Sequence, residues 1–299
     1  MKKLVKKIAA LTVFALLIGI LTPVTAKAAT VKQTMYVGEK FEYVIYGTTF
    51  TSVSSSNKKV VTAAKVKNKV YACTLNAKKA GSATITIKYK DYAKKSHTQK
   101  IKVTVKKLNI SASVQDLDGG YAMIVLKNNT TQTFDRIEVQ YTLKDSSGAT
   151  VKQDTLRVSY VLNGKKAYDT IYVGRDMEID YSKSVVKVTA SDRDPNYTYK
   201  NVSSKNLVVT KQGETDNGNT ISFKLKLQNK LNKYVQVVNY LISYDAQGNI
   251  IDIGKRTNYM NKKATLTTSE YTISRNTTSH PDFDHYEIVT QAFTSERTN

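Results

Sequence analysis

Strict alternation of apolar and polar residues is the feature that most limits what this chain can fold into. Between residues 83 and 90 the odd positions hold apolar residues such as Ile85 and Ile87, and the even positions hold Thr or Lys. The same pattern returns between residues 100 and 106, around Ile101 and Val103. Successive side chains of a strand point to opposite faces, so this pattern predicts sheets with one buried face and one face in water. Turn signals at 37–39, 54–57 and 80–82 divide the region into short strands, as in a β-sandwich.

Three segments of this region, 36–41, 54–61 and 76–87, resemble the bacterial immunoglobulin-like type 2 (BIG2) domain. The stretch from Lys78 to Ile87 is the most specific part of the resemblance. The aromatic residue that often precedes the Ser-Ser-Asn turn is missing, and Val53 stands near that place. The resemblance implies an extracellular sandwich over residues 29–107 that serves adhesion or spacing, without catalysis.

The remaining chain contains two copies of one unit, residues 108–206 and 207–299, related by an offset of 100 positions. Each copy has a hairpin with Asp at the start and Gly at the end of a four-residue turn, which is type I turn chemistry. Apolar residues occupy odd positions before the turn in the first copy and even positions in the second. This difference predicts either a bulge or a strand that is covered on both faces. The pairs that define the offset include Asn129 with Asn229, Asp145 with Asp245, and Gly148 with Gly248.

Both copies resemble the FxLYD-type domain of exported Gram-positive proteins. The first copy matches through 125–129 and 141–148, and the second through 225–229 and 241–248. The resemblance implies a small extracellular β-sandwich and no reaction. Together with the first region, it gives an all-β chain of three tandem immunoglobulin-like sandwiches.

Residues 1–28 have the composition of a signal peptide. Lys2, Lys3, Lys6 and Lys7 precede an apolar run from 8 to 21, and Ala26-Lys27-Ala28 follows. A charged start, a short apolar stretch and an Ala-x-Ala site are typical of export with cleavage, here after Ala28. We therefore expect a secreted, extracellular protein that has no membrane contact after cleavage and is held at the cell wall, if at all, without a covalent bond.

Positive charge is concentrated in the first region. Residues 29–107 carry 17 lysines against three acidic residues, a net charge of +14, whereas residues 108–299 carry 24 basic and 21 acidic residues, a net charge of +3. Such asymmetry points to an anionic partner. We expect a ladder of like charges across adjacent strands on the wet face, formed by Lys88, Lys90, Lys100, Lys102 and Lys106.

The ladder has two interpretations. Lysines on a wet face keep a sheet soluble and block aggregation. Like charges that face one another also destabilise a sheet unless something neutralises them. For the region as a whole we favour an anionic polymer of the cell wall, above all teichoic acid, or a surface glycan. Specific binding of nucleic acid is not expected, because Tyr89 alternates onto the opposite face from Lys88 and Lys90. The sequence leaves open whether the repeats bind a protein ligand.

Catalysis is not expected, and neither is a cofactor. The lone Cys73 lies in an apolar stretch that reads as a strand, which favours a buried thiol. The residue types of a divalent metal site occur together in one segment, and we favour a polar loop before a strand there. The alternatives are a metal-dependent extracellular enzyme that uses this segment, or an adhesin for host glycan. The segment's candidate ligands are His280, Asp282, Asp284, His285 and Glu287.

Overall fold

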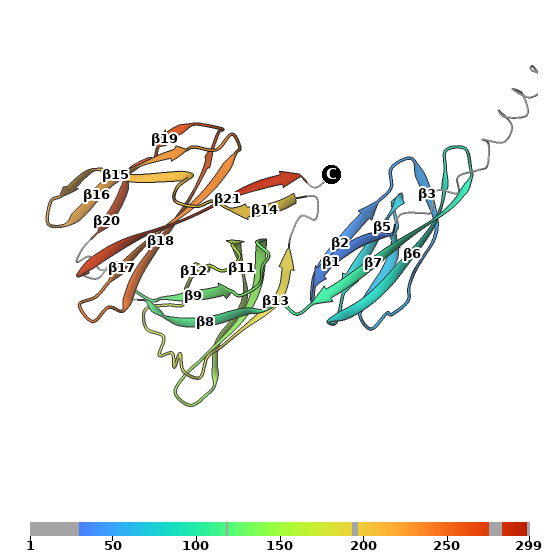
Figure 1. Cartoon of the computed structure of the whole chain (residues 1–299). Helices are drawn as coiled ribbons and strands as arrows, with labels where there is room; N and C mark the ends of the chain where they lie inside the picture. The colour runs from blue at the N-terminus through green and yellow to red at the C-terminus, as the bar shows by residue number, and fades with distance from the viewer. Residues whose placement is uncertain (1–29, 118, 193–196, 275–282, 298–299) are drawn as a thin grey trace, which may run out of the picture.

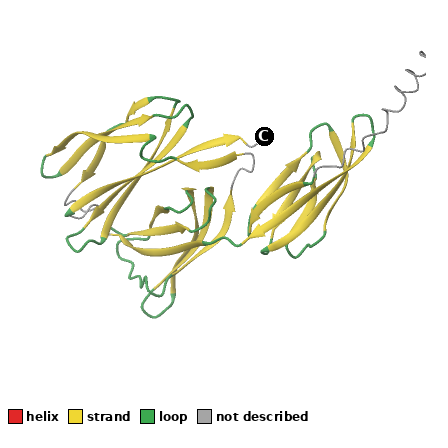
Figure 2. Cartoon of the chain, viewed as in Figure 1, coloured by secondary structure: helices red, strands yellow, loops and turns green. Residues whose placement is uncertain are grey.

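The computed structural model describes residues 30–117, 119–192, 197–274 and 283–297. All regular secondary structure in these ranges is β-strand, and they contain no helix (Figure 2). The expected all-β fold is confirmed. The described ranges accordingly offer no helix with the length and apolarity to cross a membrane.

The first sandwich pairs a four-stranded sheet, β1-β7-β6-β3, with a three-stranded sheet, β2-β5-β4 (Figure 1). Its core contains Ile85, Ile87, Ile101 and Val103, all fully buried, so the predicted inner face is confirmed. Cys73 is also buried in this core, as expected. The strands are β1 (Val31–Tyr36), β2 (Lys40–Val44), β3 (Thr48–Ser55), β4 (Val61–Val66), β5 (Lys69–Ala77), β6 (Gly81–Asp91) and β7 (Ser96–Lys106).

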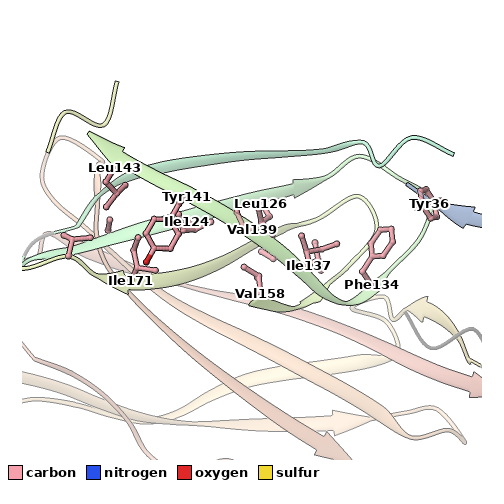
Figure 3. Packing of buried hydrophobic residues seen from close by; sticks show 14 residues of the cluster. Tyr36, Ile124, Leu126, Phe134, Ile137, Val139, Tyr141, Leu143, Val158 and Ile171 are labelled. Atoms are coloured by element: carbon pink, nitrogen blue, oxygen red, sulfur yellow. The ribbon is translucent and has the colours of Figure 1, made fainter. Parts of the chain in front are cut away.

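The first copy of the repeat forms a second sandwich from the sheets β11-β10-β13 and β12-β9-β8. Figure 3 shows its core, with Phe134 at one end beside Tyr36 of the first sandwich. These two rings meet edge to face at a centroid distance of 5.2 Å, so β1 contributes a side chain to the neighbouring core. The strands are β8 (Ile110–Leu117), β9 (Tyr121–Asn128), β10 (Phe134–Lys144), β11 (Thr150–Val161), β12 (Lys166–Tyr172) and β13 (Val185–Asp192).

The second copy repeats this arrangement with the sheets β14-β21-β17-β18 and β15-β16-β19, the latter extended by β20, which pairs with β16. The extra strand β14 precedes the copy in sequence and pairs antiparallel with β21. The strands are β14 (Tyr197–Asn201), β15 (Leu207–Asp216), β16 (Thr220–Asn229), β17 (Val235–Tyr244), β18 (Ile250–Met260), β19 (Thr265–Thr267), β20 (Tyr271–Ser274) and β21 (His285–Arg297).

A buried asparagine shows how the two copies correspond. The Nδ2 of Asn128 donates to the carbonyls of Gln132 at 2.8 Å and Val161 at 3.0 Å. The Nδ2 of Asn229 makes the equivalent bonds, both at 2.8 Å, to the carbonyls of Lys233 and Asn261. The structural partner of Asn229 is therefore Asn128 and not Asn129, because the offset is 101 in β9 and β16 and becomes 100 in the hairpin that follows.

The two copies pack face to face and form four layers of sheet. The outer side of β12-β9-β8 lies against the outer side of β14-β21-β17-β18, through a buried cluster that includes Met123, Tyr168 and Tyr240 (Figure 1). The rings of Tyr168 and Tyr240 meet edge to face at 5.1 Å. At the rim of this interface, Lys255 Nζ lies 3.6 Å from the carboxylate of Asp169.

This packing explains the shifted alternation in β17. Val237 and Leu241 face the core of their own sandwich, as the odd positions of β10 do. Val238, Tyr240 and Ile242 face the first copy and are buried as well. Of the two explanations that the sequence left open, coverage on both faces is confirmed.

Candidate polymer-binding face

The five lysines predicted as a site lie on one surface. Lys88 and Lys90 belong to β6, and Lys100, Lys102 and Lys106 belong to β7, the strand hydrogen-bonded beside it. All five are exposed, and each alternates with a residue that points into the core or packs against it. We call the outer surface of the sheet β1-β7-β6-β3 the lysine face.

The lysines do not face one another across β6 and β7, which corrects the expected ladder of opposed charges. Lys88 lies opposite Thr98, and Lys90 lies opposite Ser96. Lys100 and Lys102 lie opposite Thr86 and Thr84, and Lys106 lies opposite Tyr36 of β1. Lys88 and Lys100 are therefore diagonal neighbours, a separation of about 7–8 Å that lowers their mutual repulsion, and the other lysines of β6 and β7 lie farther apart across the two strands. Across β6 and β7, sheet stability therefore gives no reason to require an external counter-ion.

Lys32 belongs to this surface, and the sequence reasoning missed it. It is exposed on β1, directly opposite Lys102, where the two strands run parallel. The alternation in residues 31–36 could have placed it on a wet face. The pairing of β1 with β7 joins the two ends of the sandwich sequence, and no local pattern predicts it.

The acidic residues of the first sandwich are engaged elsewhere. Glu42 pairs with Lys69 at 2.7 Å, and Asp91 pairs with His97 at 2.7 Å. The hydrogen bond from His97 holds the pKa of Asp91 below its ordinary value. Glu39 is buried and accepts the backbone N–H of Tyr36 at 2.9 Å. Among the described residues, none of the five predicted lysines has a carboxylate within ion-pair distance.

Hydroxyl groups fill the positions between the ammonium groups. Thr84, Thr86, Ser96 and Thr98 occupy the alternate positions across β6 and β7, and on β3 Ser52 lies opposite Lys88. Along one strand, side chains two residues apart on the same face are about 6.6–6.8 Å apart. The surface thus presents repeated cations with hydrogen-bonding groups between them. Such a surface can hold an extended anion.

Basic residues also border the junction with the second sandwich. Lys78, Lys79 and Lys107 line a hollow of about 550 Å³ together with Leu108 and Val188. This hollow lies at the end of the lysine face near Lys106, and it continues the positive surface toward β13.

The candidate metal segment is described only in part. His280 and Asp282 lie outside the described residues. His285 pairs with Asp284 at 2.9 Å, and its ring stacks on Tyr244 at 4.8 Å. Glu287 accepts a hydrogen bond from the hydroxyl of Tyr244 at 3.1 Å. Within the described ranges no three His, Cys, Asp or Glu side chains are grouped as a metal site would require.

Comparisons with known proteins give no family for the chain. No model of a known family matches it, and no curated protein matches it. The BIG2 and FxLYD resemblances therefore stay predictions.

Among solved structures, the chain aligns with a tetra-tandem repeat from the extending region of a large adhesion protein. That alignment has 11% identity and a TM-score of 0.18, and covers 88% of this chain and 74% of that one. It also aligns with red sea bream transglutaminase at 9% identity and a TM-score of 0.19, covering 72% and 37% of the two chains. A third alignment is with SGBP-B of a Bacteroides ovatus mixed-linkage glucan utilization locus, solved with a heptasaccharide. It has 9% identity and a TM-score of 0.19, and covers 92% and 98%.

Proposed function

We propose that this chain is an exported, non-catalytic binding protein whose lysine face holds an anionic polymer, with cell-wall teichoic acid as the first candidate. One observation carries the proposal: five predicted lysines and Lys32 share one sheet surface that has no carboxylate. A field of one sign over a continuous surface attracts polyanions and raises their local concentration.

The mode of binding follows from the kind of side chain. Lysine is a compact, hydrated charge on a flexible stem, so it contacts phosphates as a point charge and without bidentate geometry. Binding would therefore tolerate an irregular polymer and would weaken steeply with salt, as counter-ions are released from the polyanion. The two copies of the repeat pack against each other into one unit, which we call the fused block. Its remaining surface is available to a protein ligand.

The test measures how tightly the protein, residues 29–299, binds to purified cell walls and to walls stripped of teichoic acid. The variant replaces Lys88, Lys90, Lys100 and Lys102 by Gln. For a single-stranded polyanion the slope of log affinity against log salt is about 0.7 per neutralised phosphate, so loss of four contacts lowers it by roughly 3. Stripped walls should bind far less wild-type protein than intact walls.

A matched control removes the same charge from exposed lysines in the second copy and directly before it: Lys205, Lys224, Lys226 and Lys230, each replaced by Gln. The control should keep nearly the wild-type slope if the lysine face is the site. Equal losses in the two variants would reduce the effect to net charge, and equal binding to intact and stripped walls would remove teichoic acid as the partner.

A further inference from the structure

Three tyrosines belong to the turns and strand starts at one end of the first sandwich. This is the end opposite the junction with the second sandwich, which follows the last residue of β7 (Figure 1). Tyr46 lies in the turn between β2 and β3, Tyr92 in the turn between β6 and β7, and Tyr71 near the start of β5. Tyr46 is 82% exposed and Tyr92 is 91% exposed. We call this group the aromatic tip.

Two of the rings are in contact, and two are largely exposed: Tyr46 packs on the partly buried Tyr71, and Tyr92 lies nearby in water. Tyr46 lies 5.6 Å from Tyr71, centroid to centroid, with a tilt of 34°. The ring of Tyr92 lies over Gly47, where a Cβ atom would come within 2.6 Å of its Cε2. Gly47 has a φ of +75°, so a side chain there would be strained as well as crowded. The lack of a side chain at Gly47, next to Tyr46 in sequence, therefore lets the Tyr92 ring lie against this turn.

Packing does not explain this group. Large aromatic side chains are usually buried over most of their surface, and they supply contact area where partners bind. Clustered rings on a protein surface therefore mark an interaction site more often than scattered ones do. The tip also lies far from the interface between the repeats, so the fused block does not cover it.

Positive charge surrounds the rings and joins the tip to the lysine face. Lys94 and Lys95 share a turn with Tyr92. Lys90, which belongs to the lysine face, lies at the end of β6 next to this turn. Two acids lie in this region, and both are engaged. Asp91 pairs with His97 and accepts the backbone N–H of Lys95 at 2.9 Å, and Glu42 pairs with Lys69 at 2.7 Å. A polyanion that lies along β6 toward its end therefore reaches the rings without meeting an unpaired carboxylate among the described residues.

We propose that the aromatic tip binds sugar rings of the anionic polymer, which rests on the function proposed above. A saccharide ring has flat apolar faces that stack on tyrosine and a polar rim that the tyrosine hydroxyls and nearby threonines can contact. An acyl chain would need an apolar surface free of charge. The ligand class is thus a polymer whose repeating unit carries both an anionic group and a saccharide ring.

The experiment uses three probes: linear polyphosphate, which has charge and no ring; polygalacturonate, which has one carboxylate on each sugar ring; and single-stranded oligothymidylate. The test variant is Tyr46→Ala with Tyr92→Ala, and Tyr46→Phe with Tyr92→Phe is the conservative variant. The control is Tyr172→Ala with Tyr234→Ala, which removes two exposed tyrosines of the repeats. Thermal unfolding of each variant checks that the exposed substitutions leave the fold intact.

We expect the test variant to lose about ten- to a hundredfold in affinity for polygalacturonate, the range that alanine substitution of stacking aromatics gives. Its affinity for polyphosphate should change less than twofold, and the Phe variant and the control should stay near wild type with both probes. If the wild type binds none of the probes, the proposed function itself fails. If the wild type binds polyphosphate and polygalacturonate equally tightly, and the test variant binds both as tightly as the wild type does, the proposal that the aromatic tip binds sugar rings fails while the proposed function stands. A loss confined to oligothymidylate would overturn the sugar assignment.

Discussion

The face-to-face packing of the repeats predicts a measurable coupling between Tyr168 and Tyr240. Tyr240 is fully buried at the interface, meets the ring of Tyr168 edge to face, and has Lys255 Nζ 5.9 Å from its ring centroid. Truncating a buried aromatic side chain to Ala costs about 3–5 kcal/mol. In a folding unit of 150–250 residues, each kcal/mol lowers Tm by about 2–4 °C, so Tyr240→Ala should lower it by roughly 6–20 °C.

The assay is calorimetric and denaturant-induced unfolding of residues 29–299, following the transition that contains the repeats. Tyr168→Ala, Tyr240→Ala and the double variant complete a double-mutant cycle. Because an edge-to-face ring pair contributes about 0.5–1.5 kcal/mol beyond its buried area, the double variant should be less destabilised than the sum of the single variants by about that amount.

Tyr234→Ala serves as the control, since Tyr234 is 63% exposed and its ring contacts Lys262 on the surface. Its effect should stay within about 1 kcal/mol. A Tyr240→Ala shift no larger than that of the control, or a coupling near zero, would refute the packing of the two copies against each other.

Two further outcomes follow from buried groups. Asn128→Ala should lower the free energy of unfolding by about 2–4 kcal/mol in a denaturation assay, because it leaves the carbonyls of Gln132 and Val161 without their donor. The control is Asn129→Ala, at an exposed position, which should cost under about 0.5 kcal/mol in the same assay. Burial raises the pKa of the Cys73 thiol to about 12, so a thiol-reactive dye should label the folded protein at pH 8 far more slowly than the protein in denaturant. Equal labelling rates would contradict the buried placement.

Local pattern predicts much of the fold and only part of the candidate site. Alternation placed Ile85, Ile101 and Lys88 on the correct sides of their strands, because the side-chain period of a strand is fixed. The expected opposition of lysines across β6 and β7 was wrong, because the register pairs Lys88 with Thr98 and Lys100 with Thr86. Alternation within one strand does not determine the register with its neighbour.

Features that need the whole topology were beyond the sequence. Tyr46, Tyr71 and Tyr92 come from separate parts of the first sandwich, and only the pairing of their strands brings the rings to one end. The covered outer side of β17 gave a visible signal in the shifted alternation, but the identity of the covering surface was not contained in that strand.

Coverage of β17 on both sides has a consequence for how the two copies can diverge. From Arg136 onward, the even positions of β10 hold polar residues such as Gln140, whereas most of the matching positions of β17 hold apolar or aromatic residues that pack against the neighbouring copy. The copies are therefore no longer interchangeable. A chimera with two second-type units, or a truncation that starts at residue 207, would present a naked apolar sheet, and we expect such products to self-associate.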